Sequence, residues 1–236
     1  MITRLPGNPP IEVQVRRSAR ARRYALRVSA SNGAVTLTVP ARAPLDEGLA
    51  FLHEKAAWVR AHLARQPARP RLGHGAALPI EGIARTIAPG EGRAVRLGDD
   101  HVAVPGPEAE IGARLRGFLR ARARARLAMA CAHHASAAGL NFGRLTLRDT
   151  RSRWGSCTAA GNLMFSWRLV MAPPAVLDYV AAHEVAHRAE MNHSPAFWAV
   201  VARLCPDYAT HRAWLRREGP GLLMYDFGAE PQAQGD

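Results

Sequence analysis

One segment, residues 179–198, constrains the fold more than any other. It reads "YVAAHEVAHRAEMNHSPAFW" and places three histidines in a largely apolar run. His183 and His187 are four residues apart, so on an α-helix their imidazole rings leave the same face one turn apart. That spacing allows both rings to bind one metal ion. The apolar residues around them, such as Val180 and Val185, predict a buried helix, and a buried histidine needs a polar partner or a metal.

Glu184 follows the first of these histidines and is rotated from it around the helix by about 100°. It therefore does not simply add a ligand, but it can reach a water molecule on the metal. This arrangement is the H-E-x-x-H pattern of zinc hydrolases, in which the glutamate is the general base. The plainer alternative is that both histidines are core residues with protein partners. The apolar flanks of the helix favour the metal.

A catalytic zinc site usually has three protein ligands and leaves the fourth position to water. His193 is the leading third ligand, because "NHSP" breaks the helix after His187 and lets the chain turn back. Glu190 is the rival, since it shares the helical face of His183 but lies two turns further along. We therefore expect one Zn²⁺ per chain, held by the three histidines, with Glu184 as the catalytic residue.

The expected chemistry needs further polar groups near the metal. Zinc lowers the pKa of its bound water to about 7, and Glu184 would accept the proton as that water attacks a polarised carbonyl. Tyr208, His211 or Arg153 could then donate to the developing oxyanion, and the spacing does not select among them. Arg151 and Arg153 in "RSRWGSC" could instead bind a substrate carboxylate or phosphate, which arginine forks suit.

Charge and composition limit the partners. Lys55 is the only lysine among 32 basic residues, and the net charge of +13 favours anionic partners such as nucleic acid, although a high arginine content can also reflect a GC-rich genome. The three scattered cysteines predict reduced thiols. No apolar run of signal-peptide or membrane length occurs, so we expect a cytoplasmic protein with no membrane partner.

The remaining sequence predicts an α+β chain. Alternating apolar and polar residues around Asn-Gly and Gly-Asp turns predict antiparallel strands between residues 11 and 104, with one helix over about 45–66. "VPGPEAE" interrupts both periodicities and predicts a boundary at 106/107. A long helix ending at Gly139, two strands in "RLTLRDT" and "NLMFSWRLV", and helices from 174 and from 194 to 204 follow. The domains are then a β-rich region 1–106, a compact metal-binding domain 107–222 and a tail 223–236.

Four segments, "RSRWGSC", "NLMFSWRLVMAPPAVLDYVAAHEVAH", "NHSPAFW" and "PDYATHRAWL", together resemble the YgjP-like metallopeptidase domain family, relatives of the SprT-like zincins. The resemblance covers about 114–219, and "RRSARARRYALRV" is similar to the family's opening strand. It implies a minigluzincin-type domain in which a helix and a β-hairpin precede the zinc helix. It also implies that His183, His187 and His193 are the ligands and Glu184 the catalytic acid/base. Val185 stands where the family often has leucine.

These observations predict a zinc-dependent metallohydrolase, with a metalloprotease as the leading interpretation. An extended polypeptide substrate could then pair with the edge of "NLMFSWRLV". Because some members of the family carry a nucleotide pyrophosphatase assignment, hydrolysis of UTP-like nucleotides is the alternative, although no Walker-type loop is present. A nucleic-acid-associated zinc protein is a second alternative. A basic cluster near the N-terminus would suit phosphates or be a solvated strand face: Arg16, Arg17, Arg20, Arg22 and Arg23.

Overall fold

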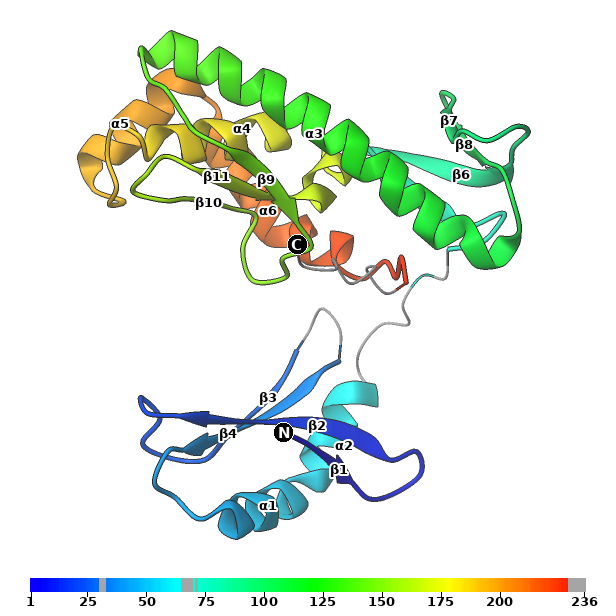
Figure 1. The fold of residues 1–236 in the computed structure, drawn as a ribbon, viewed down its shortest axis with the longest axis vertical. Coiled ribbons are helices and arrows are strands. Elements are labelled where there is room, and N and C mark those ends of the chain that lie inside the picture. Colours follow the sequence, from blue (N-terminus) through cyan, green and yellow to red (C-terminus); the bar gives the residue numbers. More distant parts are fainter. Residues whose placement is uncertain (30–32, 65–69, 71, 229–236) are drawn as a thin grey trace. The chain divides into compact units, whose positions relative to one another are not determined.

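The computed structural model describes residues 1–29, 33–64, 70 and 72–228. The chain forms two compact units, Met1–Ala68 and Arg69–Asp236, each with its own hydrophobic core (Figure 1). The boundary that the sequence suggests at 106/107 falls inside the second unit. There Val102 and Val104 belong to the same core as Ile111 and Leu115.

The first unit is a four-stranded sheet with two helices. Its strands β1(Ile2–Leu5), β2(Ile11–Ser18), β3(Ala25–Val28) and β4(Val35–Pro40) have the order β1-β2-β4-β3. β2 and β4 are parallel and the other pairs antiparallel, so the expected β3–β4 hairpin is confirmed, although Asn32 of its turn lies outside the described residues. The single expected helix is divided at Lys55 into α1(Leu45–Glu54) and α2(Ala56–Ala64).

The second unit begins with a sheet of the same strand order, β5-β6-β8-β7. Its strands are β5(Ala77–Ile80), β6(Ile83–Pro89), β7(Arg96–Leu97) and β8(His101–Val104). Because β7 pairs on the outer side of β8, the chain returns next to β6 in the same direction, and this central pair is parallel. A fully antiparallel arrangement, as the sequence suggests, is therefore wrong for both sheets.

After the short 3-10 helix η1(Glu108–Glu110), the long helix α3(Ile111–Ala138) lies along α4(Pro174–Ala186) in the second unit (Figure 1). Gly139 ends α3 in the left-handed conformation, with φ 65° and ψ 30°, as its position in the sequence predicts. The apolar row expected on one face of the helix is buried: Leu115, Leu119, Ala123, Leu127 and Cys131. This face therefore forms one side of the core that supports α4.

A three-stranded sheet lies beside α4 and differs from the two-stranded hairpin that the sequence predicts. Its order is β10-β11-β9, with β9(Leu145–Arg148), β10(Gly155–Cys157) and β11(Leu163–Ser166). The hairpin joins β10 to β11, whereas β9 is parallel to β11. The chain leaves β11 after Ser166 as the 3-10 helix η2(Trp167–Met171), because Arg168 turns inward, where its guanidinium binds Asp149 at 2.6 Å. "NLMFSWRLV" therefore supplies the central strand and not an edge.

Three helices complete the unit. α4 and α5(Pro195–Leu204) lie where the sequence predicts them, and α6(Tyr208–Leu222) is a further helix that the periodicity did not reveal. Beyond α6, Phe227 is buried and its ring contacts that of Trp167 edge to face at 4.9 Å. Of the expected tail 223–236, residues 229–236 lie outside the described part of the chain. No helix in the described ranges is both long and apolar enough to span a bilayer.

Candidate metal centre

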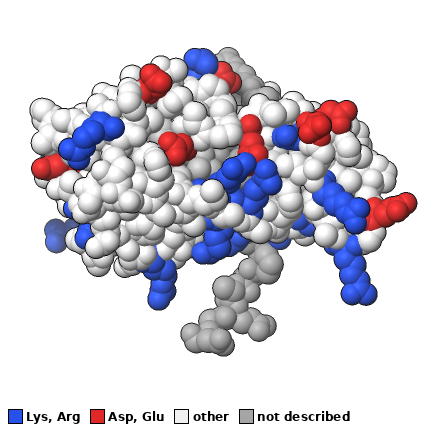
Figure 2. Space-filling view, turned by 90° about the horizontal axis from the view of Figure 1, so that it is seen from above, with Lys and Arg blue, Asp and Glu red and all other residues white. Residues whose placement is uncertain are grey.

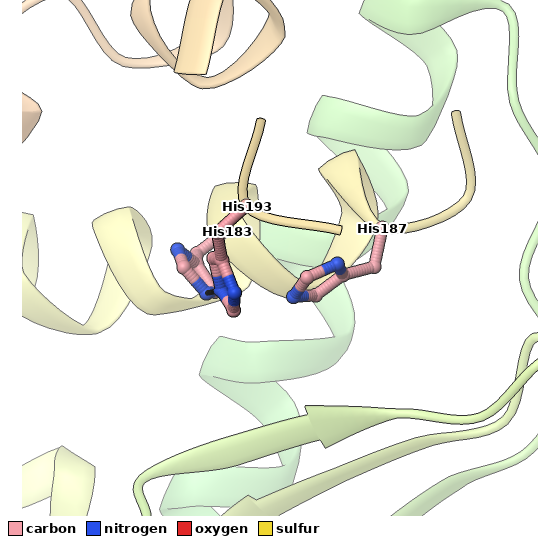
Figure 3. A group of neighbouring side chains, drawn as sticks. All are labelled: His183, His187 and His193. Atoms are coloured by element: carbon pink, nitrogen blue, oxygen red, sulfur yellow. Dashed lines mark hydrogen bonds between the residues drawn. The ribbon is translucent and has the colours of Figure 1, made fainter. Parts of the chain in front are cut away.

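Three imidazole rings converge at the end of α4 (Figure 3). His183 belongs to α4, His187 directly follows the last residue of this helix, and His193 lies in the loop before α5. The Nε2 atoms of His183 and His193 are 3.1 Å apart, and the candidate ligand atoms of all three residues lie within 4.8 Å of one another. Two nitrogen ligands at about 2.0–2.1 Å from a tetrahedral zinc lie roughly 3.3 Å apart. The donor set and its spacing therefore fit one such ion.

The loop between α4 and α5 returns His193 to the other two histidines because both of its ends are fixed. The hydroxyl of Ser194 accepts a hydrogen bond from the amide of Phe197 at 3.3 Å, which caps α5, and Pro195 is the first residue of that helix. The turn predicted from "NHSP" is thus a helix start that reverses the chain. The sequence pattern predicts this turn but does not indicate that the Phe197 side chain packs against the histidines.

Phe197 is fully buried beneath the three histidines. Its ring centroid lies 4.9 Å from that of His183, 4.5 Å from that of His187 and 4.8 Å from that of His193. An aromatic ring in contact with all three imidazoles limits how far each can rotate. The one sequence signal for this residue is its position as the third residue after the capping serine, where a helix turns an apolar side chain inward.

A backbone carbonyl orients His187. Its Nδ1 lies 3.1 Å from the carbonyl oxygen of Glu190. A carbonyl can only accept, so Nδ1 carries the proton and Nε2 is left with its lone pair directed elsewhere, which is the arrangement common to metal-ligating histidines. Glu190, the rival third ligand, thus contacts the cluster through its backbone, and its carboxylate is not among the clustered ligand atoms.

Burial favours the neutral form of His183 and His187. It lowers the pKa of His183 to about 3, with smaller contributions from His187 and His193, and it also lowers the pKa of His187. A histidine must be deprotonated to bind a metal. The environment of the rings therefore favours the protonation state that a metal ligand needs.

Glu184 lies on the side of the cluster that faces β10. Its side chain is almost fully buried, and its carboxylate packs so closely on Gly155 that a Cβ atom there would overlap it. Within the described residues, Oε2 of Glu184 has no hydrogen-bond partner. Without a metal, burial raises the pKa of this carboxyl to about 8, and Arg153 opposes the shift. A cation held by the three histidines would lower this pKa further, toward the ionised form that can accept a proton.

The histidines and Glu184 open into one cavity of roughly 270 Å³. Arg153, Gly155, Ser156, Cys157 and Met191 complete its lining. Burial raises the pKa of the Cys157 thiol, so this cysteine is neutral near pH 7. A donor set for one metal therefore shares one opening with a carboxyl group whose Oε2 has no partner among the described residues, which is the arrangement that metal-assisted hydrolysis requires.

The other residues considered from the sequence are placed differently. Arg153 lines the histidine cavity and, with Arg151, a second cavity beside it. Tyr208 stacks on Trp198, with ring centroids 5.3 Å apart, and Trp198 in turn packs beside the rings of His183 and His193. Neither Tyr208 nor His211, both on α6, lines the histidine cavity. Two further arginines of α6 line the second cavity, and the sequence did not single them out: Arg212 and Arg216.

The basic N-terminal cluster belongs to the first unit. Arg17 in this cluster is used structurally, because its guanidinium donates to the carbonyl oxygens of Ala41 and Ala43 at 2.8 and 3.0 Å. On the face shown in Figure 2, several basic side chains lie together near the centre beside acidic ones, and others are scattered toward the edges. The high net charge is therefore not gathered into a single patch on that face.

A sequence profile of the family described as "YgjP-like, metallopeptidase domain" matches residues 22–218, most of the chain. Neither the curated proteins nor the solved structures contain a significant match to this chain.

Proposed function

The chain belongs to the YgjP-like metallopeptidase family, and from this premise we propose that it is a zinc-dependent protease that hydrolyses peptide bonds in unfolded polypeptides. One observation carries the proposal. The ligand atoms of His183, His187 and His193 cluster beside the carboxyl group of Glu184, and all four residues open into the same cavity. This combination provides both a metal site and a group that can move a proton.

We assign the metal ligands to the three histidines, one Zn²⁺ per chain. Zinc, when bound, supplies an acidified water molecule and polarises the carbonyl group of the substrate. Glu184 accepts a proton at Oε2, the carboxylate oxygen that has no partner among the described residues, and returns it to the leaving amine. Phe197 and the Glu190 carbonyl hold the imidazoles in place, while Arg153 lies near enough to the cavity to orient the substrate.

The substrate strand would align along β10 and not along "NLMFSWRLV", whose strand is central. β10 is an edge strand, and the side that faces β11 is already hydrogen-bonded. The Ser166 amide donates to the Trp154 carbonyl oxygen at 2.8 Å, and the Thr158 amide donates to the Asn162 carbonyl oxygen at 3.0 Å. In an antiparallel ladder, hydrogen-bonded and outward-directed residues alternate. The backbone groups of Gly155 and Cys157 therefore point away from β11, toward a substrate that adds as a further strand.

The test is metal content and hydrolysis measured on the same purified proteins. We expect about one zinc per chain in the wild type, in line with a single three-histidine site, and loss of that zinc in His193→Ala. Glu184→Gln should keep the zinc but lose cleavage of unfolded casein. Zinc-loaded wild type that cleaves no unfolded polypeptide between about pH 6 and 9, the range in which general acid and base groups work, would contradict the proposal, as would hydrolysis of UTP alone.

A further inference from the structure

A second cavity adjoins the proposed metal centre and has a different chemical character. We propose that it binds a carboxylate of the substrate, so that the protein prefers acidic peptides. This inference rests on the proposed peptidase function and names the substrate class for it. The cavity has a volume of roughly 330 Å³ and lies between the loop before β10, the helix α4 and the helix α6.

The two cavities lie next to each other and share one lining residue. Arg153 lines both of them. Tyr179, on α4 one turn before the first histidine, lines the basic cavity, and its ring centroid lies 6.0 Å from that of His183. A side chain held there therefore belongs to a substrate residue close to the bond being cleaved.

The charge of this cavity has one sign. In the part of the chain that the structure describes, four arginines line it and no acidic residue does: Arg151, Arg153, Arg212 and Arg216. Within the described residues, no Asp or Glu forms an ion pair with Arg153, Arg212 or Arg216. The guanidinium groups of Arg212 and Arg216, for which no ion pair with an Asp or Glu is found in that part of the chain, repel one another, and a bound anion relieves this repulsion.

Two arginines of α6 line this cavity, whereas the next arginine along the helix, Arg217, does not. Arg212 and Arg216 are four residues apart, so they project from the same face of the helix. Arg212 is additionally held by Trp198, with its guanidinium carbon 4.6 Å from the ring centroid. Arg217 instead pairs with Glu218 at 2.6 Å and does not line the cavity. The position of each residue on the helix thus places Arg216 at the cavity, where it can bind an anion, and Arg217 in a surface ion pair.

The lining favours a carboxylate carried on a peptide side chain. Trp154, Leu215 and Leu223 provide apolar walls that suit the methylene groups of a glutamate, while the guanidinium groups suit its carboxylate. The edge of β10 begins directly after Trp154. A peptide paired with that edge would therefore pass the opening of the cavity with its backbone already aligned.

The experiment compares peptides that differ only by Glu or Gln at one position near the cleaved bond. For the zinc-loaded wild type we expect kcat/KM to be at least about tenfold higher for the best Glu peptide, since a hydrogen bond to a charged group is stronger than one to a neutral group. Arg216→Gln should reduce this ratio toward one, and Arg216→Glu should reverse it. Arg217→Gln, which removes the same charge from the next residue, should leave the ratio unchanged. Peptides with a free or amidated C-terminus distinguish a side-chain carboxylate from a terminal one.

Binding provides the second readout. Glu184→Gln protein should bind a fluorescein-labelled Glu peptide more tightly than its Gln counterpart, and Arg216→Gln added to it should remove the difference. If no peptide is cleaved but this binding preference is present, the proposed hydrolysis fails and the carboxylate site stands. Equal rates and equal binding for Glu and Gln peptides would overturn the site, and so would a preference that Arg217→Gln abolishes equally. Tighter Arg216-dependent binding of UTP than of any peptide would also overturn it.

Discussion

At the residue scale, the carboxyl group of Glu184 and the backbone of Gly155 occupy a contact that leaves no room for a side chain. We expect Gly155→Ala to displace Glu184 and to lower kcat by about a hundredfold, because a misplacement of about 1 Å can cost that much. Zinc content should not change. The measurement is kcat with the zinc-to-protein ratio on the same sample.

Gly117→Ala is the matched control for that substitution. Gly117 is exposed within α3, and a Cβ atom there would meet nothing within 4 Å. This change should leave kcat unchanged and stabilise the protein by about 0.5–1 kcal/mol, the helix cost of glycine relative to alanine. Full activity in Gly155→Ala would show that the position of Glu184 does not depend on this contact.

The contacts of Phe197 predict that this residue contributes to the affinity for zinc. Replacing it by leucine keeps an apolar side chain but removes the ring that contacts all three imidazoles. We expect the affinity for zinc to fall by about 10- to 100-fold, as when other groups that orient metal ligands are changed. Competition with a chromogenic chelator measures it.

The control for Phe197→Leu is a variant that weakens the same core elsewhere. Val102→Ala changes a residue of β8 that lies in the core of the second unit and does not line the histidine cavity. It should lower stability and keep the wild-type zinc affinity. If Phe197→Leu binds zinc as tightly as Val102→Ala, the aromatic contacts do not position the ligands.

The metal ligands and Glu184 could be predicted from the sequence, whereas the residues that pack against them could not. His183, Glu184 and His187 could be assigned to a candidate site because their chemistry repeats at helical spacing, and His193 because a Ser-Pro helix start follows it. Gly155 and Phe197 could not be assigned, because their roles depend on which atoms pack on them. Nothing in the local pattern around a small or apolar residue states that an imidazole or carboxylate will lie against it.

At the element scale, the turn between β5 and β6 fastens its sheet to α3. Glu81 occupies this turn with φ 53°, and its carboxylate binds Arg122 at 2.8 Å and Arg126 at 2.7 Å. The Arg122 hydrogen bond is the largest influence on the Glu81 pKa, which falls to about 2 even though burial opposes the shift. A carboxyl group whose pKa is lower in the folded than in the unfolded state stabilises the protein at pH values above the unfolded-state pKa. This stabilisation is lost as the pH falls toward the folded-state pKa.

Glu81→Gln should therefore lower the free energy of unfolding near pH 7 by about 1–2 kcal/mol, a value reduced for the partial exposure of both arginines. The difference from wild type should shrink as pH falls from about 4.5 toward 2, the interval between the unfolded and folded pKa. Urea unfolding at a series of pH values measures it. Glu218→Gln, which removes an exposed ion pair, is the control and should have little effect at any pH. A difference that grows on acidification would contradict this role.

The elements themselves could be predicted from the sequence unequally. Long segments with strong helical periodicity, such as α3 and α5, lie where expected. β10 was missed because it has three residues and lies in a segment rich in turn-forming residues. The parallel pairs β2–β4, β6–β8 and β9–β11 could not be predicted, since alternation marks a strand without naming its partner.

At the scale of the whole molecule, two sheets of the same strand order, each followed by helical structure, precede the segment that carries the histidines. The first sheet packs with α1 and α2 in a core that includes Leu37 and Leu52. The second contributes to the core shared with α3 and α4, through Leu78 and Ile87. Proline and glycine after β8 suggest a boundary in the sequence, yet the side chains on either side of that point are buried together.

This difference predicts the outcome of two truncations. A chain of residues 69–236 keeps every member of the second core, so it should unfold cooperatively and bind zinc as the full chain does. A chain of residues 107–236 lacks the buried residues of β5, β6 and β8, each of which contributes about 1.5–3 kcal/mol when fully buried. The sum over these residues is comparable to the whole stability of a domain, about 5–15 kcal/mol, so this shorter chain should not fold. Circular dichroism melts and zinc-to-protein ratios on both chains test this, and a folded, zinc-binding 107–236 would support a domain boundary at 106/107.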